Sequence, residues 1–369
     1  MNKNNNFGGV LDCFGDHVPA AERIFARQFL RHYPGVEDEV HTPAEQARMI
    51  SGAFDFMRRR KPGELLIRVY NPAEQEHGWS STHTVVAMVN DDLPFLVDSV
   101  VLALSRLNVG VHLIIHPVVK LKRDQGGHLL EMVEDDASGQ AAVESLIHIR
   151  IDRQTSPDML ARIERRVRSA LADVRVAVRD WKPMTRKALE IADELAESYS
   201  GLNDEELSEA REFFKWLADD YFTFLGYREY EISESDEGRT LAPIEDSGLG
   251  LMRETHSQAP TRLLSRLSGD ARGTGRDIHP IIITKTNGRA TVHRDGYMDY
   301  ISVLRFDENG QVSGEKRIIG LFTSGAYIRR CVDTPLVRTK VRRVLERSGL
   351  RPGSHAGKAL MHILETLPR

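Results

Sequence analysis

Hydrophobic residues in the first 60 positions recur at helical spacing. The stretch "PAAERIFARQFLRHY" places Phe25 and Phe29 on one face, and apolar residues three and four positions apart are typical of an amphipathic helix. The stretch "TPAEQARMISGAFDFMRRR" repeats this pattern. A proline and a glycine in "KPGE" then interrupt it,. We therefore predict that residues 1–64 form an N-terminal helical segment.

The pattern changes to strands and helices between residues 65 and 183. Runs rich in β-branched residues predict strands, and they read "LLIRVY", "THTVVAMVN", "GVHLIIHPVVKLKR", "HLLEMV" and "ESLIHIRID". The last of these runs is either a continuation of the strand before it or a separate strand. A helical stripe of valines and leucines follows the second run, at 94–107,. A second helix begins after Ser156 as cap, with Pro157 in its first turn,.

The valine-rich run "VRVAVRDW" at 174–181 predicts a closing strand,. The resulting order is that of an α+β, ferredoxin-like βαββαβ domain over residues 65–183, with "LLIRVY" as an added edge strand. Both helices would pack on one face of an antiparallel sheet. The other face would be open unless another segment covers it.

The remaining sequence predicts a second domain between helical segments. Residues 184–220 carry two helical patterns, and Asn203 with Glu206 forms the cap signature of the second,. Strand patterns such as "YFTFLGYREYEI", "YMDYISVLRF" and "GEKRIIGLFTS" then dominate,. We predict a helical connector at 184–220, a second α+β domain on an antiparallel sheet at 221–330, and a helical tail at 331–369.

Composition narrows the class of protein. The chain has 369 residues, a formal net charge of −4 and 41% hydrophobic residues, which predicts a globular protein of two or three domains. No global basic field attracts nucleic acid or an anionic membrane, and no apolar run reaches the roughly 18 residues of a membrane span. Cys13 and Cys331 lie at opposite ends of the chain, which suits a reducing compartment. We therefore expect a cytoplasmic protein without nucleic-acid or membrane partners.

The stretch "VNDDLPFLVDSV" places two carboxylates and a proline before the helix at 94–107. In one interpretation, backbone N–H groups at the helix start bind the carboxylate of a small ligand. In the other, Asp91 or Asp92 caps the helix while Pro94 presets its first turn, and the local pattern favours this capping. If the ligand is an amino acid, one of the two acids should face its ammonium group.

Other clusters give weaker indications of chemistry. His112 and His116 would lie about 13 Å apart along one strand, which is too far for one metal, so they are pocket-lining or ordinary sheet residues and we predict no metal site. The basic run "RRRK" at 58–61 is either a phosphate-binding patch or a solvated helix end, and the dipole favours the latter.

A third cluster lies between two predicted strands. Its members, His293, Arg294, Asp295 and Asp299, could form an acid–base centre, but "RDG" is also an ordinary turn and we favour the turn. The glycine runs "GLG" and "GTG" do not follow a strand and open a helix as nucleotide loops do. The sequence also has no phosphate-binding P-loop and no nucleophile elbow,. We predict no catalytic centre and no cofactor site in these residues.

Several long stretches, in order along the chain, resemble the N-terminal region of the large bacterial NAD-dependent glutamate dehydrogenases. They include "RVYNP", "HGWSSTHT", "DDLPFLVDSV", "FTFLGYREYEI", "TKTNGRATVHRDGYMDYISV" and "RSGLRPGSHAGKALMHILETLPR". The resemblance runs from about residue 66 to the end, and the first 60 residues carry little of it.

The resemblance implies an ACT-type βαββαβ domain and a second mixed domain likened to PAS folds. It implies that the dehydrogenase core, with its NAD site, lies downstream in a longer parent protein, which oxidises L-glutamate to 2-oxoglutarate and ammonia. The chain itself would then need no cofactor, and its partners would be a second copy and the downstream catalytic region. The alternatives are a free-standing ACT-type amino-acid-binding or scaffold protein, and an independent enzyme using the cluster at 293–299.

ACT modules commonly bind amino-acid effectors at the loop between the first strand and the first helix, together with the second strand. The resemblance therefore implies the following effector-binding residues: Asn90, Asp91, Asp92, Leu93, Pro94, Phe95, Val111, His112, Leu113 and Ile114. Many ACT loops carry a glycine for close backbone approach to the ligand, and this loop has none. The module is thus either an effector site or an assembly surface alone.

Overall fold

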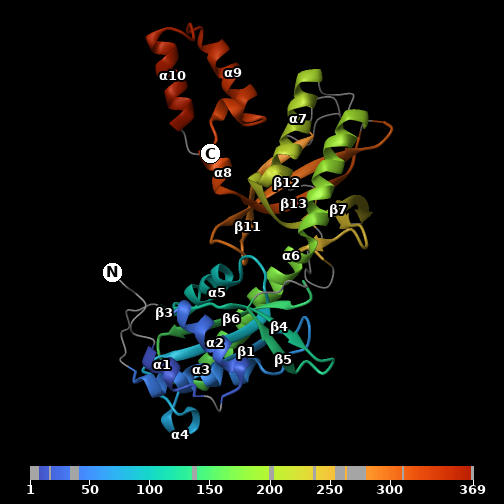
Figure 1. The fold of residues 1–369 in the computed structure, drawn as a ribbon. Coiled ribbons are helices and arrows are strands. Elements are labelled where there is room, and N and C mark those ends of the chain that lie inside the picture. Colours follow the sequence, from blue (N-terminus) through green and yellow to red (C-terminus); the bar gives the residue numbers. More distant parts are fainter. Residues whose placement is uncertain are drawn as a thin grey trace. The chain divides into compact units, whose positions relative to one another are not determined.

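A computed structural model describes residues 8–15, 18–33, 41–134, 139–198, 203–235, 238–253, 262–263, 280–309 and 311–366. The chain forms two compact units. Unit 1 comprises Met1–Val174 with the short segment Thr291–Arg294, and unit 2 comprises Arg175–Ala290 with Asp295–Arg369. Each unit contains one antiparallel sheet with helices (Figure 1), so the predicted α+β class is confirmed.

The sheet of unit 1 is built around one central strand, β6, which is buried from residue 144 to 151. Strand β2 pairs with β6 on one side, and β3 and β4 follow each other along its other side. The edges are β1, beside β2, and β5, beside β4. The bounds are β1 (Leu66–Tyr70), β2 (Thr84–Asp91), β3 (Val111–Ile115), β4 (Val118–Arg123), β5 (Leu129–Val133) and β6 (Ala142–Ile151).

The closing strand predicted at 174–181 is wrong, because these residues belong to the long helix α6 (Pro157–Ser198). Val174, Ala177, Asp180 and Met184 are buried, and this spacing of three and four follows the helical period rather than the alternation of a strand. The place beside β2 that a closing strand would take is filled by β1, as the predicted edge strand. The sheet therefore has the strand neighbours of a ferredoxin-like sheet, but its edge strand comes from before the motif in the sequence instead of after it.

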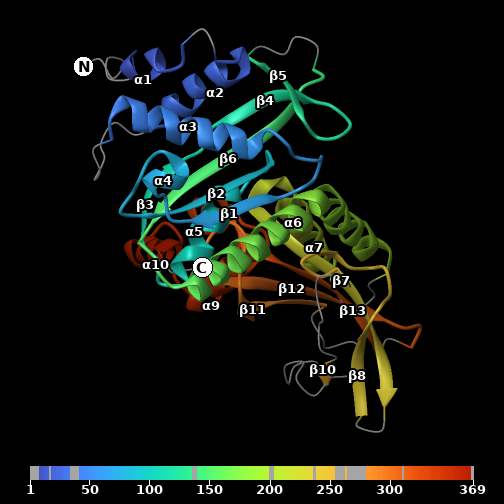
Figure 2. The ribbon, with the colours of Figure 1, turned by 90° about the horizontal axis from the view of Figure 1, so that it is seen from below.

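Helices cover both faces of this sheet (Figure 2). Alternate residues of β2, such as Val85 and Ala87, share a core with Phe25, Phe29 and Phe54 of the N-terminal helices. The other face carries α5 and the first half of α6. The face that was predicted to be open is therefore closed by the chain's own first helices. These are α1 (Gly8–Asp12), α2 (Ala20–Arg31) and α3 (Pro43–Met57), with α4 (Glu74–His77) and α5 (Leu96–Ser105) following.

Unit 2 contains the predicted second antiparallel sheet, in the order β10-β8-β7-β13-β12-β11, with β9 beside β7. The second half of α6 and α7 (Asp204–Trp216) share an apolar core with this sheet, and Asn203 caps α7 as predicted. The likeness to PAS folds stays a prediction. The strands are β7 (Phe222–Ser235), β8 (Gly238–Pro243), β9 (Leu249–Gly250), β10 (Arg262–Leu263), β11 (Ile281–Arg289), β12 (Tyr297–Phe306) and β13 (Val312–Phe322).

Helix α8 (Ser324–Ile328) follows β13, and within the predicted helical tail the described residues contain α9 (Val337–Ser348) and α10 (His355–Thr366). Helix α9 ends at Gly349, which adopts a left-handed conformation that glycine takes without steric penalty. Within the described ranges of the chain, no helix has both the length and the apolar character needed to cross a membrane.

Candidate functional site

The predicted effector loop, residues 90–95, joins the end of β2 to the start of α5. Asn90 and Asp91 still belong to β2, where they pair with Ser145 and Glu144 of β6. Helix α5 follows Phe95, which has a φ of 69° and gives the helix no side-chain cap. The predicted capping by Asp91 or Asp92 is therefore wrong, because the two carboxylates lie before this left-handed turn and bond to other partners.

Asp91, whose side chain is partly exposed, joins three buried charged side chains in a group that we call the paired-arginine cluster: Arg60, Asp91, Arg123 and Glu144. Arg60, only 1% exposed, donates to Asp91 over 2.7 Å and pairs with Glu144 at 2.9 Å. Arg123 donates two hydrogen bonds of 2.8 Å to the same glutamate. Two guanidinium groups thus face two carboxylates, which offsets the cost of burying them. The prediction of a solvated helix end at 58–61 is wrong for Arg60.

Asp92 is exposed, and its carboxylate accepts a 2.6 Å hydrogen bond from the Ser145 hydroxyl. The Nε2 atom of His116 lies 3.0 Å from the same hydroxyl oxygen. Burial lowers the pKa of His116, although the Asp92 carboxylate opposes this shift. The three side chains form one hydrogen-bonded chain beside the loop, and the imidazole at its end favours the neutral form.

The second half of the predicted effector site lies elsewhere in the same sheet. Ile114 pairs with Ile149, while Asn90 at the loop pairs with Ser145. Four residues along β6 separate these two positions, which is about 13 Å at 3.3 Å per residue. Residues 90–95 and 111–114 therefore do not meet within one copy of the chain, and their joint role in binding stays a prediction.

The two histidines of β3 and its end have different partners. His112 lies 2.8 Å from an Asp152 carboxylate oxygen, whereas His116 contacts Ser145. Asp152 also accepts the Gly110 N–H at 2.6 Å, and both hydrogen bonds lower the pKa of that carboxyl. In the part of the chain that the structure describes, no group of three or more histidine, cysteine or acidic side chains is arranged to hold a metal ion.

The side chains of the cluster considered at 293–299 have different partners. Lys285 pairs with Asp299 over 2.6 Å, and Arg289 pairs with Asp295 over 2.5 Å. The ring of His293 instead lies 4.7 Å from the ring of Phe95. Each of the two acids is thus engaged by a separate cation, and the bends at 291–296 agree with the favoured turn.

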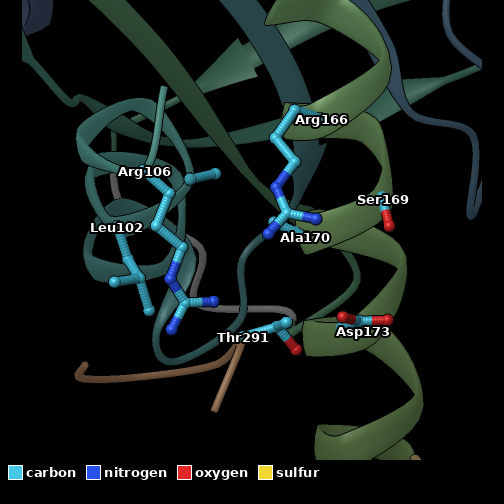
Figure 3. A pocket seen from close by; sticks show the side chains of 8 residues that line it. Leu102, Arg106, Arg166, Ser169, Ala170, Asp173 and Thr291 are labelled. Carbon is cyan, nitrogen blue, oxygen red and sulfur yellow. The ribbon is translucent and has the colours of Figure 1, made fainter. Parts of the chain in front are cut away.

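Arginines line a hollow between α5 and α6 that the sequence interpretation missed. This arginine hollow has a volume of about 430 Å³ and is lined by Arg106, Leu107, Arg162, Arg165, Arg166 and Ser169. Figure 3 shows the adjoining smaller pocket, where Arg106 from α5 and Arg166 from α6 extend toward the gap between the helices. The sequence did contain a signal for this hollow: Arg162, Arg165 and Arg166 are spaced at i, i+3 and i+4, and residues at this spacing share one face of a helix.

Two comparisons of sequence agree with this architecture. A family profile described as "Glutamate dehydrogenase, ACT1 domain" matches residues 25–167, which include α3, the sheet of unit 1 and α5. A second profile, "Glutamate dehydrogenase, helical motif 1", matches residues 334–369, which include α9 and α10. The class is therefore that of ACT-type regions of glutamate dehydrogenases, and the first profile begins well before residue 66, where the predicted resemblance started.

Full-length relatives identify the family more closely. An NAD-specific glutamate dehydrogenase of Pseudomonas aeruginosa is 35% identical over 96% of this chain and 22% of its own length. The enzyme of the same name from Halomonas elongata is 36% identical over 86% of the chain and 20% of its own length. The enzyme of the same name from Mycobacterium tuberculosis is 27% identical over 89% of this chain and 19% of its own length.

The chain corresponds to the N-terminal portion of the large NAD-specific glutamate dehydrogenases, as its sequence motifs predicted. It spans about a fifth of the length of these curated relatives.

Proposed function

We propose that this chain is the regulatory and assembly part of a large NAD-dependent glutamate dehydrogenase and contains no catalytic centre of its own. The observation that carries the proposal is the match of an ACT1 domain profile to residues 25–167, within a chain that aligns to about a fifth of each relative. NAD binding and glutamate oxidation would belong to the rest of the parent protein. We expect that protein to be cytoplasmic.

The geometry of the loop suits an α-amino acid as effector. Asp91 is neutralised by Arg60 at 2.7 Å, so it repels an incoming carboxylate less than its charge suggests. Asp92 is exposed, and while one of its oxygens accepts from Ser145, its carboxylate could also accept from a ligand ammonium. The first N–H groups of α5 have no side-chain cap, and such groups bind carboxylates.

The free edge of β3 is a place where a second copy of the chain could associate. Strand β3 pairs with β6 on one side, and among the described strands none pairs with its other side. An exposed strand edge is a template for pairing with another chain. Association of two copies at this edge would place residues 111–114 in the interface between copies, while residues 90–95 remain at the other side of β6.

An assay of glutamate oxidation by the isolated chain tests the central part of this proposal. The purified chain is mixed with L-glutamate and NAD, and NADH absorbance is followed. We expect no NADH above the no-protein control, whereas a full-length family member should produce it under the same conditions. Turnover by this chain alone would overturn the proposal.

A free-standing amino-acid-binding or scaffold protein is the alternative, and the gene distinguishes the two. A reading frame that continues far beyond Arg369 supports the dehydrogenase part. A stop codon directly after Arg369 would favour the free-standing protein. Sedimentation of the purified chain then tests assembly, because pairing of two copies at β3 requires at least a dimer.

A further inference from the structure

The arginine hollow of unit 1 gathers positive charge from two helices, and most of it comes from α6. Its lining contains four arginines and no acidic residue. Arg162, Arg165 and Arg166 form no ion pair with a carboxylate in the residues that the structure describes. The next arginine on the same helix behaves differently, because Arg168 pairs with Glu164 at 2.7 Å. The missing partners are therefore a feature of this face of α6 and not of the whole helix.

The spacing of these arginines costs the helix stability. Arg162 and Arg166 are four residues apart and Arg162 and Arg165 are three apart, so their like charges are neighbours on one face and repel. Arg106 reaches the same hollow from the end of α5. An anion between the helices would offset this repulsion and receive hydrogen bonds from several guanidinium groups at once.

Asp173 and Glu164 lie near the hollow on α6 but are not among its lining residues. Asp173 lines the smaller adjoining pocket, together with Thr291 and Arg106, and Figure 3 shows its carboxylate one turn or more beyond Ser169 along α6. Glu164 is engaged by Arg168. The hollow itself offers guanidinium donors and the Ser169 hydroxyl, which is the donor set that suits phosphate or several carboxylates.

We infer that the arginine hollow is a binding site for a small, multiply charged anion, either a phosphate compound or a polycarboxylate. Its volume of about 430 Å³ lies in the usual range for small-molecule sites. The site is separate from the effector loop at residues 90–95 and does not depend on the proposed function. Helix α5 begins after that loop and ends at Ser105, and Arg106 is its C-cap residue, so a single helix joins the two.

Calorimetric titration of the whole chain tests this inference, with pyrophosphate and tricarballylate as separate probes at one ionic strength. We expect saturable binding of at least one probe. Binding of pyrophosphate alone assigns a phosphate ligand, and binding of tricarballylate alone assigns a polycarboxylate. Binding of both supports the shared polyanion chemistry. Saturation by neither probe would overturn the inference.

Two double variants distinguish specific binding of the anion at the arginine hollow from nonspecific electrostatic attraction. Arg162→Gln with Arg166→Gln should weaken binding of the responsive probe about tenfold or more, because charge-assisted hydrogen bonds are lost. The control, Arg31→Gln with Arg59→Gln, removes the same charge from exposed positions of unit 1 and should change affinity less than about twofold. Equal weakening by both pairs would show nonspecific attraction and contradict a site. Circular dichroism of both variants should match the parent, since glutamine keeps helix propensity.

Discussion

Two groups of arginines in unit 1 differ in how the fold balances their charge. In the paired-arginine cluster, Arg60 and Arg123 are almost fully buried and bond to Asp91 and Glu144. In the arginine hollow, the guanidinium groups of α6 are partly or fully exposed and have no such partners among the described residues. Buried charge must be matched within the chain, whereas exposed unmatched charge is available to a ligand.

Removal of Arg60 should give the largest effect. Arg60→Ala leaves the buried Glu144 with Arg123 as its remaining cation and removes the partner of the partly exposed Asp91, which should cost about 3 kcal/mol of unfolding free energy. Urea unfolding measures this loss. Lys122→Ala is the control, because Lys122 and Glu131 form an exposed pair at 3.0 Å that contributes about 1 kcal/mol or less. Similar losses in both variants would mean that the paired-arginine cluster does not hold the end of β2.

Acid should weaken unit 1 through a histidine that the fold keeps neutral. His148 is buried beside Arg150, and burial lowers its pKa to about 3. The unfolded chain therefore binds a proton near the ordinary pKa of about 6.5 that the folded chain does not, so stability rises with pH between about 3 and 6.5. From pH 7 to pH 5 we expect a loss of about 2 kcal/mol from this group.

Urea unfolding at the two pH values measures that loss. His148→Leu should flatten the pH dependence, with a smaller dependence of the same sign remaining from His116, whose pKa burial also lowers. A variant as steep as the parent would contradict the assignment.

Loss of the Ser145 hydroxyl should have an intermediate effect. Ser145→Ala removes the group that bridges Asp92 and His116, and we expect a cost of about 1–2 kcal/mol. Ser105→Ala is the matched control, since Ser105 is exposed on α5 and alanine favours helices. Thermal unfolding compares the two variants. An unchanged unfolding midpoint for Ser145→Ala would contradict a stabilising role of the hydrogen bonds between Ser145, Asp92 and His116.

The smallest effect should be a gain in stability. Arg162→Gln with Arg166→Gln removes a like-charge pair from α6, which should stabilise unit 1 by about 0.2–0.5 kcal/mol at low salt. Added salt should erase the difference, because it screens exposed charges. Denaturant titration at two salt concentrations tests this, and a loss of stability at low salt would show that these arginines already have favourable partners.

Much of unit 1 could be predicted because its periodicities are clear. The strands β2 and β6 and the helix α5 follow their hydrophobic patterns. Residues 174–181 were wrongly predicted as a strand because they are rich in valine. In the structure they belong to α6, and the buried residues Val174 and Ala177 are spaced as on a helix. Tertiary packing overrides local propensity in this way.

The charged sites were less predictable for a geometric reason. Arg60 and Asp91 are 31 positions apart, and only the sheet brings them together. The arginine hollow likewise requires α5 and α6 to lie side by side, so Arg106 cannot be assigned to it from the sequence alone. The loop at residues 90–95 was found from its motif, but its partners Ser145 and His116 were not.

Thermal unfolding of the chain with each of the twenty amino acids tests the regulatory role most directly. A bound effector stabilises the fold by mass action, so we predict a higher unfolding midpoint with one or a few amino acids. Asp92→Asn should abolish the rise, since asparagine still accepts from Ser145 but lacks the charge for an ammonium group. Asp158→Asn, at an exposed acid in the first turn of α6, should retain it. An unchanged midpoint with all twenty amino acids, or an equal rise in Asp92→Asn, would contradict an effector site at this loop.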